Sequence, residues 1–161
     1  TQSFVTREEF CVYLSRAFKL ESRAEAKQIF SDVPLDSGLA DCINALYERG
    51  IVSGYGGTFR PRDLITYNEA VKLLVATLNY DYASEVGGYP EGYLRIASGL
   101  GITKKVYAAN NLTKAAAAQL IYNAMAGSVA GILCESFSLG SLIIGIMKYD
   151  IIPKVKKITS R

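Results

Sequence analysis

The sequence contains no histidine, and this absence removes several classes of enzyme at once. A Ser/His/Asp triad and a Cys/His dyad both use an imidazole as the general base, and histidine is also the commonest zinc ligand. The three cysteines, Cys11, Cys42 and Cys134, are odd in number and lack Cys-x-x-Cys spacing, so they give no complete disulfide framework and no redox motif. We therefore expect no catalytic residues, no metal site and no cofactor.

The sequence also has little excess of charge of either sign. Its 161 residues are 50% hydrophobic and 20% charged, which is ordinary for a folded domain with a sizeable core. The formal net charge of +3 is too small to indicate a nucleic acid as the partner. We expect no nucleic-acid binding.

Long uninterrupted apolar runs are also missing. The most apolar stretch, residues 126–147, is broken by Glu135 and by several serines and glycines, whereas a bilayer span needs ~20 predominantly apolar residues. We expect a buried helix or a strand pair there, and no membrane span. Residues 150–155 alternate apolar residues with lysine, which favours a short edge strand in this C-terminal tail. The sequence starts at Thr1 without a recognisable signal peptide, so we interpret it as a fragment or a processed chain.

Three segments share one helical pattern, at residues 6–20, 66–78 and 113–125. The first two begin with a threonine followed three residues later by a glutamate, Thr6 with Glu9 and Thr66 with Glu69, which is the capping box of a helix N-terminus. The third keeps Thr113 but lacks the glutamate. Apolar residues then recur at helical spacing in all three segments, which indicates an internal repeat whose helices pack against one another.

Two further helices are predicted between these segments, at residues 39–49 and 93–100. Each is followed by a Gly-Ile pair, Gly50-Ile51 and Gly101-Ile102. Glycine directly after a helix is the usual left-handed C-terminal residue, because it has no Cβ to clash. We expect Gly50 and Gly101 to end these two helices.

The middle segment of the chain resembles one repeat of the S-layer homology family. The ordered motifs that carry this resemblance are Phe-Ser-Asp-Val at 30–33, Gly-Ile-Val-Ser-Gly-Tyr at 50–55, Gly-Thr-Phe-Arg-Pro at 57–61 and Ile-Thr-Tyr-Asn-Glu at 65–69. A single Gly-Ile-x-x-Gly would be a weak signal, whereas the ordered set is specific. Similar helix ends on both sides extend the resemblance over roughly residues 5–125.

The resemblance implies a mainly α fold with helical repeats around a central three-helix bundle. We place the end of a first repeat at residues 1–20, a second repeat at 21–80, a divergent third repeat at 81–125 and an extension at 126–161. The residues expected in the core of the bundle are Phe10, Leu14, Leu73, Leu74, Leu120 and Ile121.

The resemblance also implies a function. Members of this family anchor bacterial proteins to the cell wall by binding secondary cell-wall polysaccharide, often through a pyruvyl ketal, in grooves between repeats. A carboxylate is favoured at a helix N-terminus, and an arginine there adds a bidentate partner. We expect a non-catalytic, secreted module of the bacterial cell wall or S-layer, with secondary cell-wall polysaccharide or a peptidoglycan-linked glycan as its partner.

The residues carried over as ligand contacts occupy matching positions in the repeats. They are Arg7, Tyr67 and Lys114 at the first helical position of each repeat helix, Gly54, Tyr55, Gly56 and Gly57 in the glycine motif, and Tyr89 near the start of the third repeat. Each also has a purely structural interpretation. In that interpretation Arg7 is an exposed arginine at a helix start, and the glycines form a tight turn that needs positive φ. In the ligand-binding interpretation, Arg7→Ala weakens wall binding and leaves stability nearly unchanged.

Three alternatives stay open. The repeats could be a degenerate scaffold for structure or protein interaction without carbohydrate binding, because only one of the three helix starts keeps arginine. The discriminating feature is whether Arg7 and residues 54–57 share one concavity. A wall hydrolase would need two converging carboxylates, and no spacing selects a pair among Asp32, Asp63, Glu91 and Glu135. A homo-oligomer is the third, since an incomplete first repeat would expose apolar surface.

Overall fold

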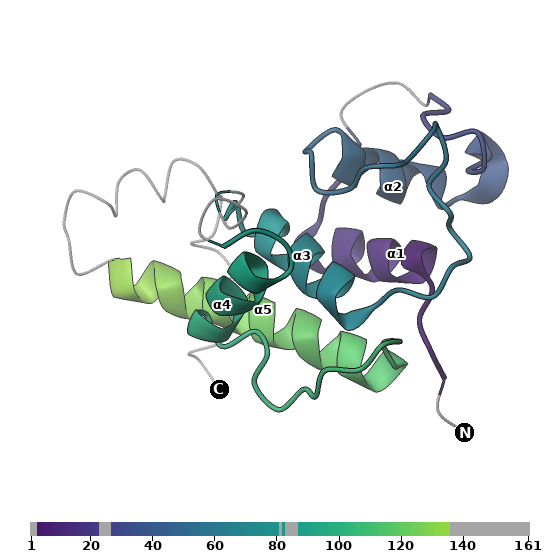
Figure 1. Cartoon of the computed structure of the whole chain (residues 1–161). Coiled ribbons are helices and arrows are strands. Elements are labelled where there is room, and N and C mark those ends of the chain that lie inside the picture. Colours follow the sequence, from purple (N-terminus) through teal and green to yellow (C-terminus); the bar gives the residue numbers. More distant parts are fainter. Residues whose placement is uncertain (1–2, 23–26, 81, 83–86, 136–161) are drawn as a thin grey trace. The chain divides into compact units, whose positions relative to one another are not determined.

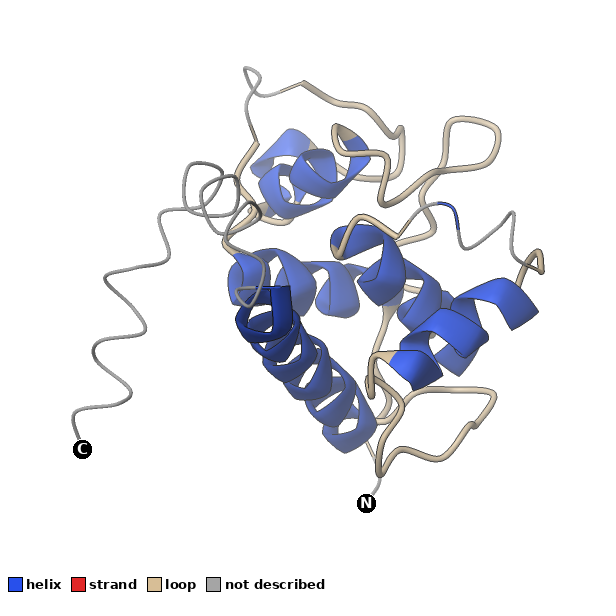
Figure 2. Ribbon diagram, turned by 90° about the vertical axis from the view of Figure 1, so that its left-hand side faces the viewer, coloured by secondary structure: helices blue, strands red, loops and turns tan. Residues whose placement is uncertain are grey.

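The computed structural model of the chain describes residues 3–22, 27–80, 82 and 87–135. The chain divides into two compact units, residues 1–125 and 126–161. The helices are α1 (Arg7–Phe18), the short 3-10 helix η1 (Leu35–Ser37), α2 (Ala40–Tyr47), α3 (Tyr67–Thr77), α4 (Glu91–Gly99) and α5 (Lys114–Glu135), of which residues 114–125 belong to the first unit. The part of the chain that the structure describes contains no strand, only isolated β-bridges (Figure 2).

The predicted mainly α fold is therefore confirmed, while the predicted tail strand at 150–155 lies outside the described residues. Helix α1 packs against α2, and α3 packs against α4 (Figure 1). Among the described residues, no helix combines the length and hydropathy needed to cross a bilayer.

The repeat helices begin at their predicted caps. The Thr6 and Thr66 hydroxyls each accept from the backbone N–H three residues on, at 3.2 Å, and the glutamates at that position accept from the threonine N–H in return. Thr113 makes only the first half of this motif, accepting from Ala116 N–H at 3.2 Å. Two complete capping boxes and one half box start the three helices as the sequence predicts.

The Gly-Ile pairs end α2 and α4 with the same hydrogen-bond pattern. Gly50 and Gly101 have φ of +70° and +73°. Gly50 N–H donates to Tyr47 O and Ile51 N–H to Leu46 O, and the corresponding pair of bonds closes α4. This is the Schellman arrangement, which satisfies the last carbonyls of each helix.

A closed ring of backbone hydrogen bonds joins the three repeat helices just before their caps. Val5 N–H donates to Leu112 O at 2.9 Å, Leu112 N–H donates to Ile65 O at 3.0 Å, and Ile65 N–H donates to Val5 O at 3.0 Å. All three side chains are almost completely buried. Each residue donates its N–H to one of the other two and accepts a hydrogen bond at its C=O from the remaining one. Three segments that are far apart in the sequence therefore meet at this point.

One hydrophobic core includes the three residues of this ring and draws on α1, α2, α3, α4 and the first part of α5, but not on η1. Of the six residues predicted for the bundle core, Phe10, Leu14, Leu74, Leu120 and Ile121 are buried. Leu73 is only partly buried. The reason is that Leu73 lies at the edge of the core, where it lines a cavity.

Candidate functional site

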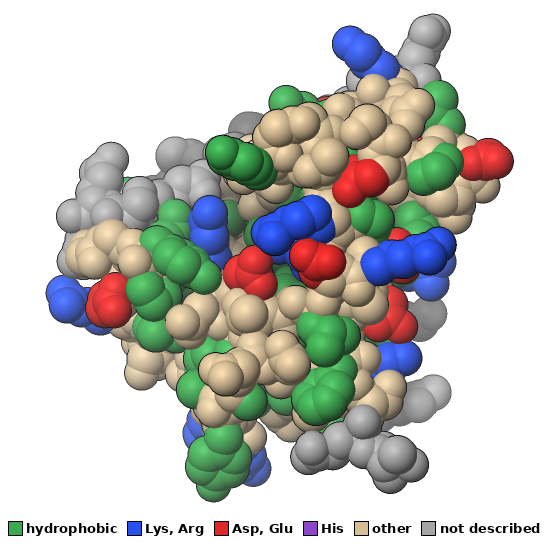
Figure 3. Space-filling model, turned by 45° about the vertical axis from the view of Figure 1, so that its right-hand side comes forward, with side chains coloured by type: hydrophobic (Ala, Val, Ile, Leu, Met, Phe, Trp, Pro, Cys, Tyr) green, Lys and Arg blue, Asp and Glu red, His purple; other side chains and the backbone are tan. Residues whose placement is uncertain are grey.

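A surface cavity lies where the first, second and third predicted repeats meet. Its volume is about 390 Å³. Its walls come from α1, from residues 51–60 (called the glycine loop below), from α3 and from Tyr89. The lining residues are Arg7, Ile51, Val52, Ser53, Gly54, Tyr55, Thr58, Phe59, Arg60, Glu69, Lys72, Leu73 and Tyr89. On the face shown in Figure 3, basic and acidic side chains lie next to one another, with hydrophobic side chains beside them.

The glycine loop is shaped by a tight hairpin turn. Tyr55 N–H donates to Thr58 O at 3.0 Å and Thr58 N–H donates to Tyr55 O at 3.1 Å. The two residues between them, Gly56 and Gly57, have φ of +58° and +79°, which side chains with a Cβ adopt only at a cost. The turn leaves Tyr55 at its tip with 89% of its surface exposed.

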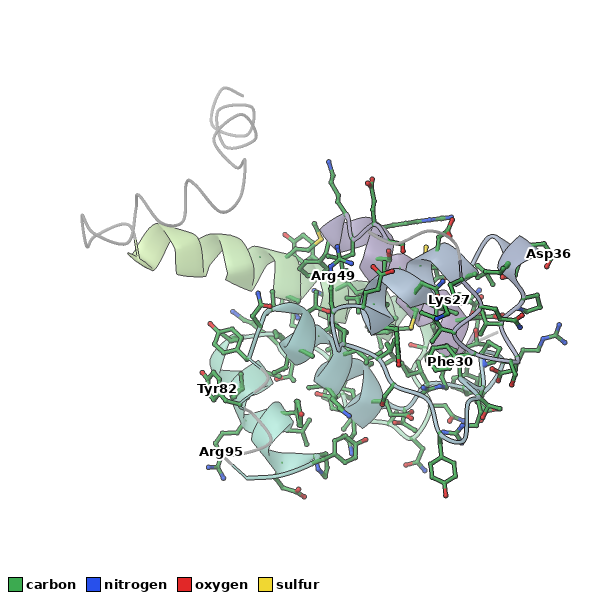
Figure 4. All side chains as sticks on the ribbon, turned by 90° about the horizontal axis from the view of Figure 1, so that it is seen from above. Lys27, Phe30, Asp36, Arg49, Tyr82 and Arg95 are labelled. Carbon is green, nitrogen blue, oxygen red and sulfur yellow. The ribbon has the colours of Figure 1, made fainter. Side chains whose placement is uncertain are left out.

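Gly54 is required for a different reason, which is close packing. Its φ is not positive, but a Cβ placed there would lie 2.5 Å from the Phe30 ring and 2.5 Å from Thr58 O. The Phe30 ring packs against Phe59 and Tyr47, with centroid separations of 5.4 Å in both cases. Figure 4 shows Phe30 toward the interior of its unit and Asp36 pointing away from the helices. Gly54 therefore lets the glycine loop lie directly on this aromatic cluster.

Asp32 binds the C-terminal end of the glycine loop, at Phe59 and Arg60. Its two carboxylate oxygens accept from Phe59 N–H at 2.8 Å and from Arg60 N–H at 2.7 Å. Burial raises the pKa of Asp32, but these backbone hydrogen bonds outweigh it, and the net effect is a pKa below the ordinary value. Arg60 has φ of +60°, so the carboxylate holds a backbone conformation that is unfavourable by itself.

Arg7 lines the cavity and joins the glycine loop to α3. Its Nε–H donates to Phe59 O at 3.1 Å, and one Nη1–H donates to Glu69 Oε1 at 3.0 Å. The guanidinium carbon lies 4.9 Å from the centroid of the Phe59 ring. With only 15% of its side chain exposed, Arg7 is a fixed part of the cavity wall and not an exposed residue at a helix start.

Glu69 holds Arg7 with one oxygen and caps α3 with the other. Its Oε2 accepts from Thr66 N–H at 2.9 Å and from the Thr66 hydroxyl at 2.8 Å, while Oε1 takes the Arg7 bond. The capping box therefore fixes the carboxylate that orients Arg7. A motif that starts a helix in one repeat also positions a side chain from another repeat.

Tyr89 and Lys72 also line the cavity and contact each other. Lys72 Nζ lies 5.7 Å from the centroid of the Tyr89 ring, a cation–π distance. Tyr89 also packs edge-on against Tyr93, with ring centroids 6.2 Å apart. Burial, and secondly the charge of Glu69, raise the pKa of the Tyr89 hydroxyl, and a hydrogen bond with Thr66 lowers it by less.

The structure brings together four of the eight predicted ligand residues. Arg7, Gly54, Tyr55 and Tyr89 line the same cavity. Gly56 and Gly57 form the turn that follows Tyr55, but they do not line the cavity. Of residues 54–57, Gly54 and Tyr55 thus share one concavity with Arg7, and Gly56 and Gly57 do not line it.

The other two predicted residues lie away from this cavity. Tyr67 is only 6% exposed and packs into the core. Burial raises the pKa of its hydroxyl, while a hydrogen bond with Thr103 lowers it. Lys114 Nζ forms an ion pair with Glu9 Oε1 at 3.1 Å, which raises the pKa of Lys114. Arg7 and Lys114 therefore each pair with a capping glutamate, but only Arg7 lines the cavity, and Tyr67 is buried.

Sequence reasoning missed three charged residues of the cavity, Arg60, Glu69 and Lys72. Arg60 lies in the Gly-Thr-Phe-Arg-Pro motif at 57–61, and Glu69 was interpreted only as a cap. Lys72 stands three residues after Glu69, a spacing that places two side chains on one helix face. That spacing was the signal that could have identified it.

Two of the carboxylates considered for a hydrolase already have partners within the protein. Asp32 is held by backbone amides, and Asp63 forms an ion pair with Arg60 at 3.5 Å. Within residues 3–22, 27–80, 82 and 87–135, no three cysteine, aspartate or glutamate side chains come close enough to hold a metal ion.

Comparison with known proteins agrees with the motifs. Residues 29–71 match the family model described as the S-layer homology domain. Over 162 aligned residues and 98% of this chain, the sequence is 30% identical to a "Middle cell wall protein" of Brevibacillus brevis and 28% identical to a "Surface layer protein" of Brevibacillus choshinensis. The chain spans only 15% and 14% of the length of these two relatives. The predicted resemblance to the S-layer homology family is thereby confirmed, with the family model matching residues 29–71.

Proposed function

We propose that this chain is a non-catalytic module that anchors a protein to the bacterial cell wall by binding an acidic wall polysaccharide in the cavity between its repeats. The observation that carries the proposal is the shared cavity, which collects Arg7, the glycine loop and Tyr89 from three separate parts of the chain. The proposed ligand is secondary cell-wall polysaccharide or a peptidoglycan-linked glycan, with a pyruvyl ketal as the acidic group.

The lining of the cavity suits an acidic sugar. Tyr55 and Tyr89 are exposed aromatic side chains against which a sugar ring can pack. Three basic side chains line the cavity, Arg7, Arg60 and Lys72, against a single acidic one, Glu69. A surplus of positive charge in a concave, partly desolvated site favours a carboxylate ligand over a neutral one.

The cavity also depends on the whole first unit. Arg7 comes from α1, Glu69 and Lys72 come from α3, and Tyr89 lies beyond residue 80. Because the ring of hydrogen bonds fixes the starts of these helices relative to one another, the ligand groups are positioned before a ligand arrives. Localisation at the cell wall or S-layer follows for this chain as part of the proposal, supported by the two relatives named for the cell wall and the surface layer.

A scaffold without carbohydrate binding is the competing function, and one observation favours it for two of the three helix starts. Tyr67 is buried, and Lys114 pairs with the capping glutamate Glu9 as Arg7 does with Glu69 but does not line the cavity. We therefore expect one binding site in the first unit.

Sedimentation with purified cell-wall sacculi tests the proposal, before and after acid stripping of their secondary polysaccharide. We expect the folded chain to co-sediment with intact sacculi and to stay in solution with stripped ones. Tyr55→Ser should lower the bound fraction severalfold, because the exposed ring contributes contact area but no core packing. The matched control is Tyr107→Ser, which removes a ring that is 91% exposed and lies outside the cavity. Failure of the folded chain to bind either preparation would support the scaffold.

A further inference from the structure

The cations that line the cavity are not equivalent, because their charges are offset to different degrees. Arg7 is paired with Glu69 at 3.0 Å, and Arg60 is paired with Asp63 at 3.5 Å. Lys72 differs from both: among the described residues, no carboxylate oxygen lies within 4.0 Å of its Nζ. The uncompensated positive charge of the cavity wall is therefore centred on Lys72.

The position of Lys72 is also defined. Its side chain is partly buried, and its Nζ lies over the Tyr89 ring at 5.7 Å from the centroid. The electron-rich face of a ring attracts an ammonium group but does not neutralise it, and the contact leaves the N–H donors available. Tyr89 therefore holds Lys72 at the edge of the cavity in a form that can still pair with an anion.

Arg7, by contrast, is already committed. Two of its N–H groups are used, by Phe59 O and by Glu69, and its planar group lies over the Phe59 ring. An anion that displaced Glu69 from Arg7 would leave one oxygen of the α3 cap carboxylate without its partner. Arg7 is better suited to fixing the wall of the site and to adding a secondary hydrogen bond than to neutralising a ligand.

We propose that Lys72 is the specificity-determining residue that pairs with the carboxylate of an acidic sugar, with the sugar ring lying between Tyr55 and Tyr89 and with Arg7 as a positioning residue. The inference rests on the proposed function, since it assigns the charge-reading residue of the same site. It selects a residue outside the motifs from which the resemblance was drawn.

The test compares two forms of one probe, the polysaccharide released from purified sacculi by enzymatic digestion of the peptidoglycan, which leaves ketal groups in place. One form keeps its carboxylates, and the other has them chemically reduced to alcohols, which leaves any phosphate untouched. Titration calorimetry of the whole chain would use Lys72→Gln, the charge-conserving Lys72→Arg, and Lys104→Gln as a matched control. Lys104 is exposed and does not line the cavity. Urea unfolding of each variant would show that it is folded.

We expect Lys72→Gln to weaken binding of the carboxylated form about tenfold, the effect of losing one charge-assisted contact. Its binding of the reduced form should equal that of the unmodified chain. Lys72→Arg should retain most of the affinity, and Lys104→Gln all of it. Equal binding of the carboxylated form by the unmodified chain and Lys72→Gln would overturn the inference while leaving the proposed function intact. Binding of the reduced form by the unmodified chain at full affinity would also overturn it, because the recognised anion would then be a phosphate. Absence of binding by the unmodified chain to either form would instead refute the proposed function.

Discussion

Replacing Gly54 by alanine tests the packing of the glycine loop most directly. A Cβ at this position would lie 2.5 Å from Thr58 O and 2.5 and 2.9 Å from two carbons of the Phe30 ring. Neither neighbour moves freely. Thr58 O accepts the hydrogen bond that closes the hairpin turn, and the Phe30 ring is held between Phe59 and Tyr47.

The magnitude follows from these contacts. Forcing one extra carbon into a packed site usually costs about 1 to 3 kcal/mol, and a contact with backbone on one side places this case near the upper end. We expect Gly54→Ala to lower the free energy of unfolding by about 3 kcal/mol, which for a unit of this size lowers the melting temperature by roughly 10 °C. Because the distorted loop lines the cavity, polysaccharide binding should weaken as well.

Gly56→Ala is the matched control. It adds the same methyl group two residues away, where nothing lies within 4 Å of the new Cβ, so only the positive φ of +58° opposes it. That conformational cost is about 1 kcal/mol. Urea unfolding followed by circular dichroism would measure both variants. A loss for Gly54→Ala no larger than that for Gly56→Ala would refute the close-packing argument.

Two further predictions concern the residues that hold the cavity. Arg7→Ala should lower the free energy of unfolding by about 2 kcal/mol, because it removes an ion pair, a hydrogen bond and a ring contact made by a side chain that is only 15% exposed. A loss below about 0.5 kcal/mol in urea unfolding would contradict this and would mean that Arg7 behaves as an exposed residue. Asp32 has a lowered pKa in the folded chain, so its contribution to stability is complete above its ordinary pKa of 3.8 and is lost as the pH falls through the lowered pKa. Between about pH 5 and pH 2, Asp32→Asn should therefore lose stability less steeply than the unmodified chain in unfolding measurements. Identical slopes for the two would contradict the role of the backbone hydrogen bonds to Asp32.

The helix boundaries could be predicted because their signals are local. A threonine and a glutamate three residues apart satisfy the free amides of a helix start through their own side chains, as at Thr6 and Thr66. A glycine at positive φ ends a helix whatever surrounds it, as at Gly50 and Gly101. Neither signal depends on the rest of the fold.

The roles of Arg7, Tyr67 and Lys114 could not be predicted in the same way. The three residues occupy one position of the repeat pattern, but what each contacts depends on the neighbouring repeat. Arg7 and Lys114 each meet a capping glutamate, Glu69 and Glu9. The third repeat lacks that glutamate, and Tyr67 is buried instead. The expectation that Arg7→Ala would leave stability nearly unchanged assumed an exposed side chain, and the pairing with another repeat removes that assumption.

Gly54 shows a similar limit. A glycine beside two other glycines predicts a turn, and Gly56 and Gly57 do have positive φ. Gly54 is instead selected by a ring that lies 24 positions earlier in the sequence. Local pattern identifies conformational glycines, whereas a glycine required by close approach becomes visible only when its distant neighbour is known.

The ring of hydrogen bonds among Val5, Ile65 and Leu112 has a consequence for the order of folding. In an open array of repeats, each repeat contacts only its neighbours, so folding can start anywhere and spread. Here Val5 is hydrogen-bonded to Leu112, more than a hundred positions later in the sequence. After that bond forms, Val5 O and Leu112 N–H are still unpaired, and both pair with Ile65. The ring cannot close until residue 112 has left the ribosome. We therefore expect the three repeat segments to acquire their final packing together and late, as one cooperative step with a high cost of loop closure.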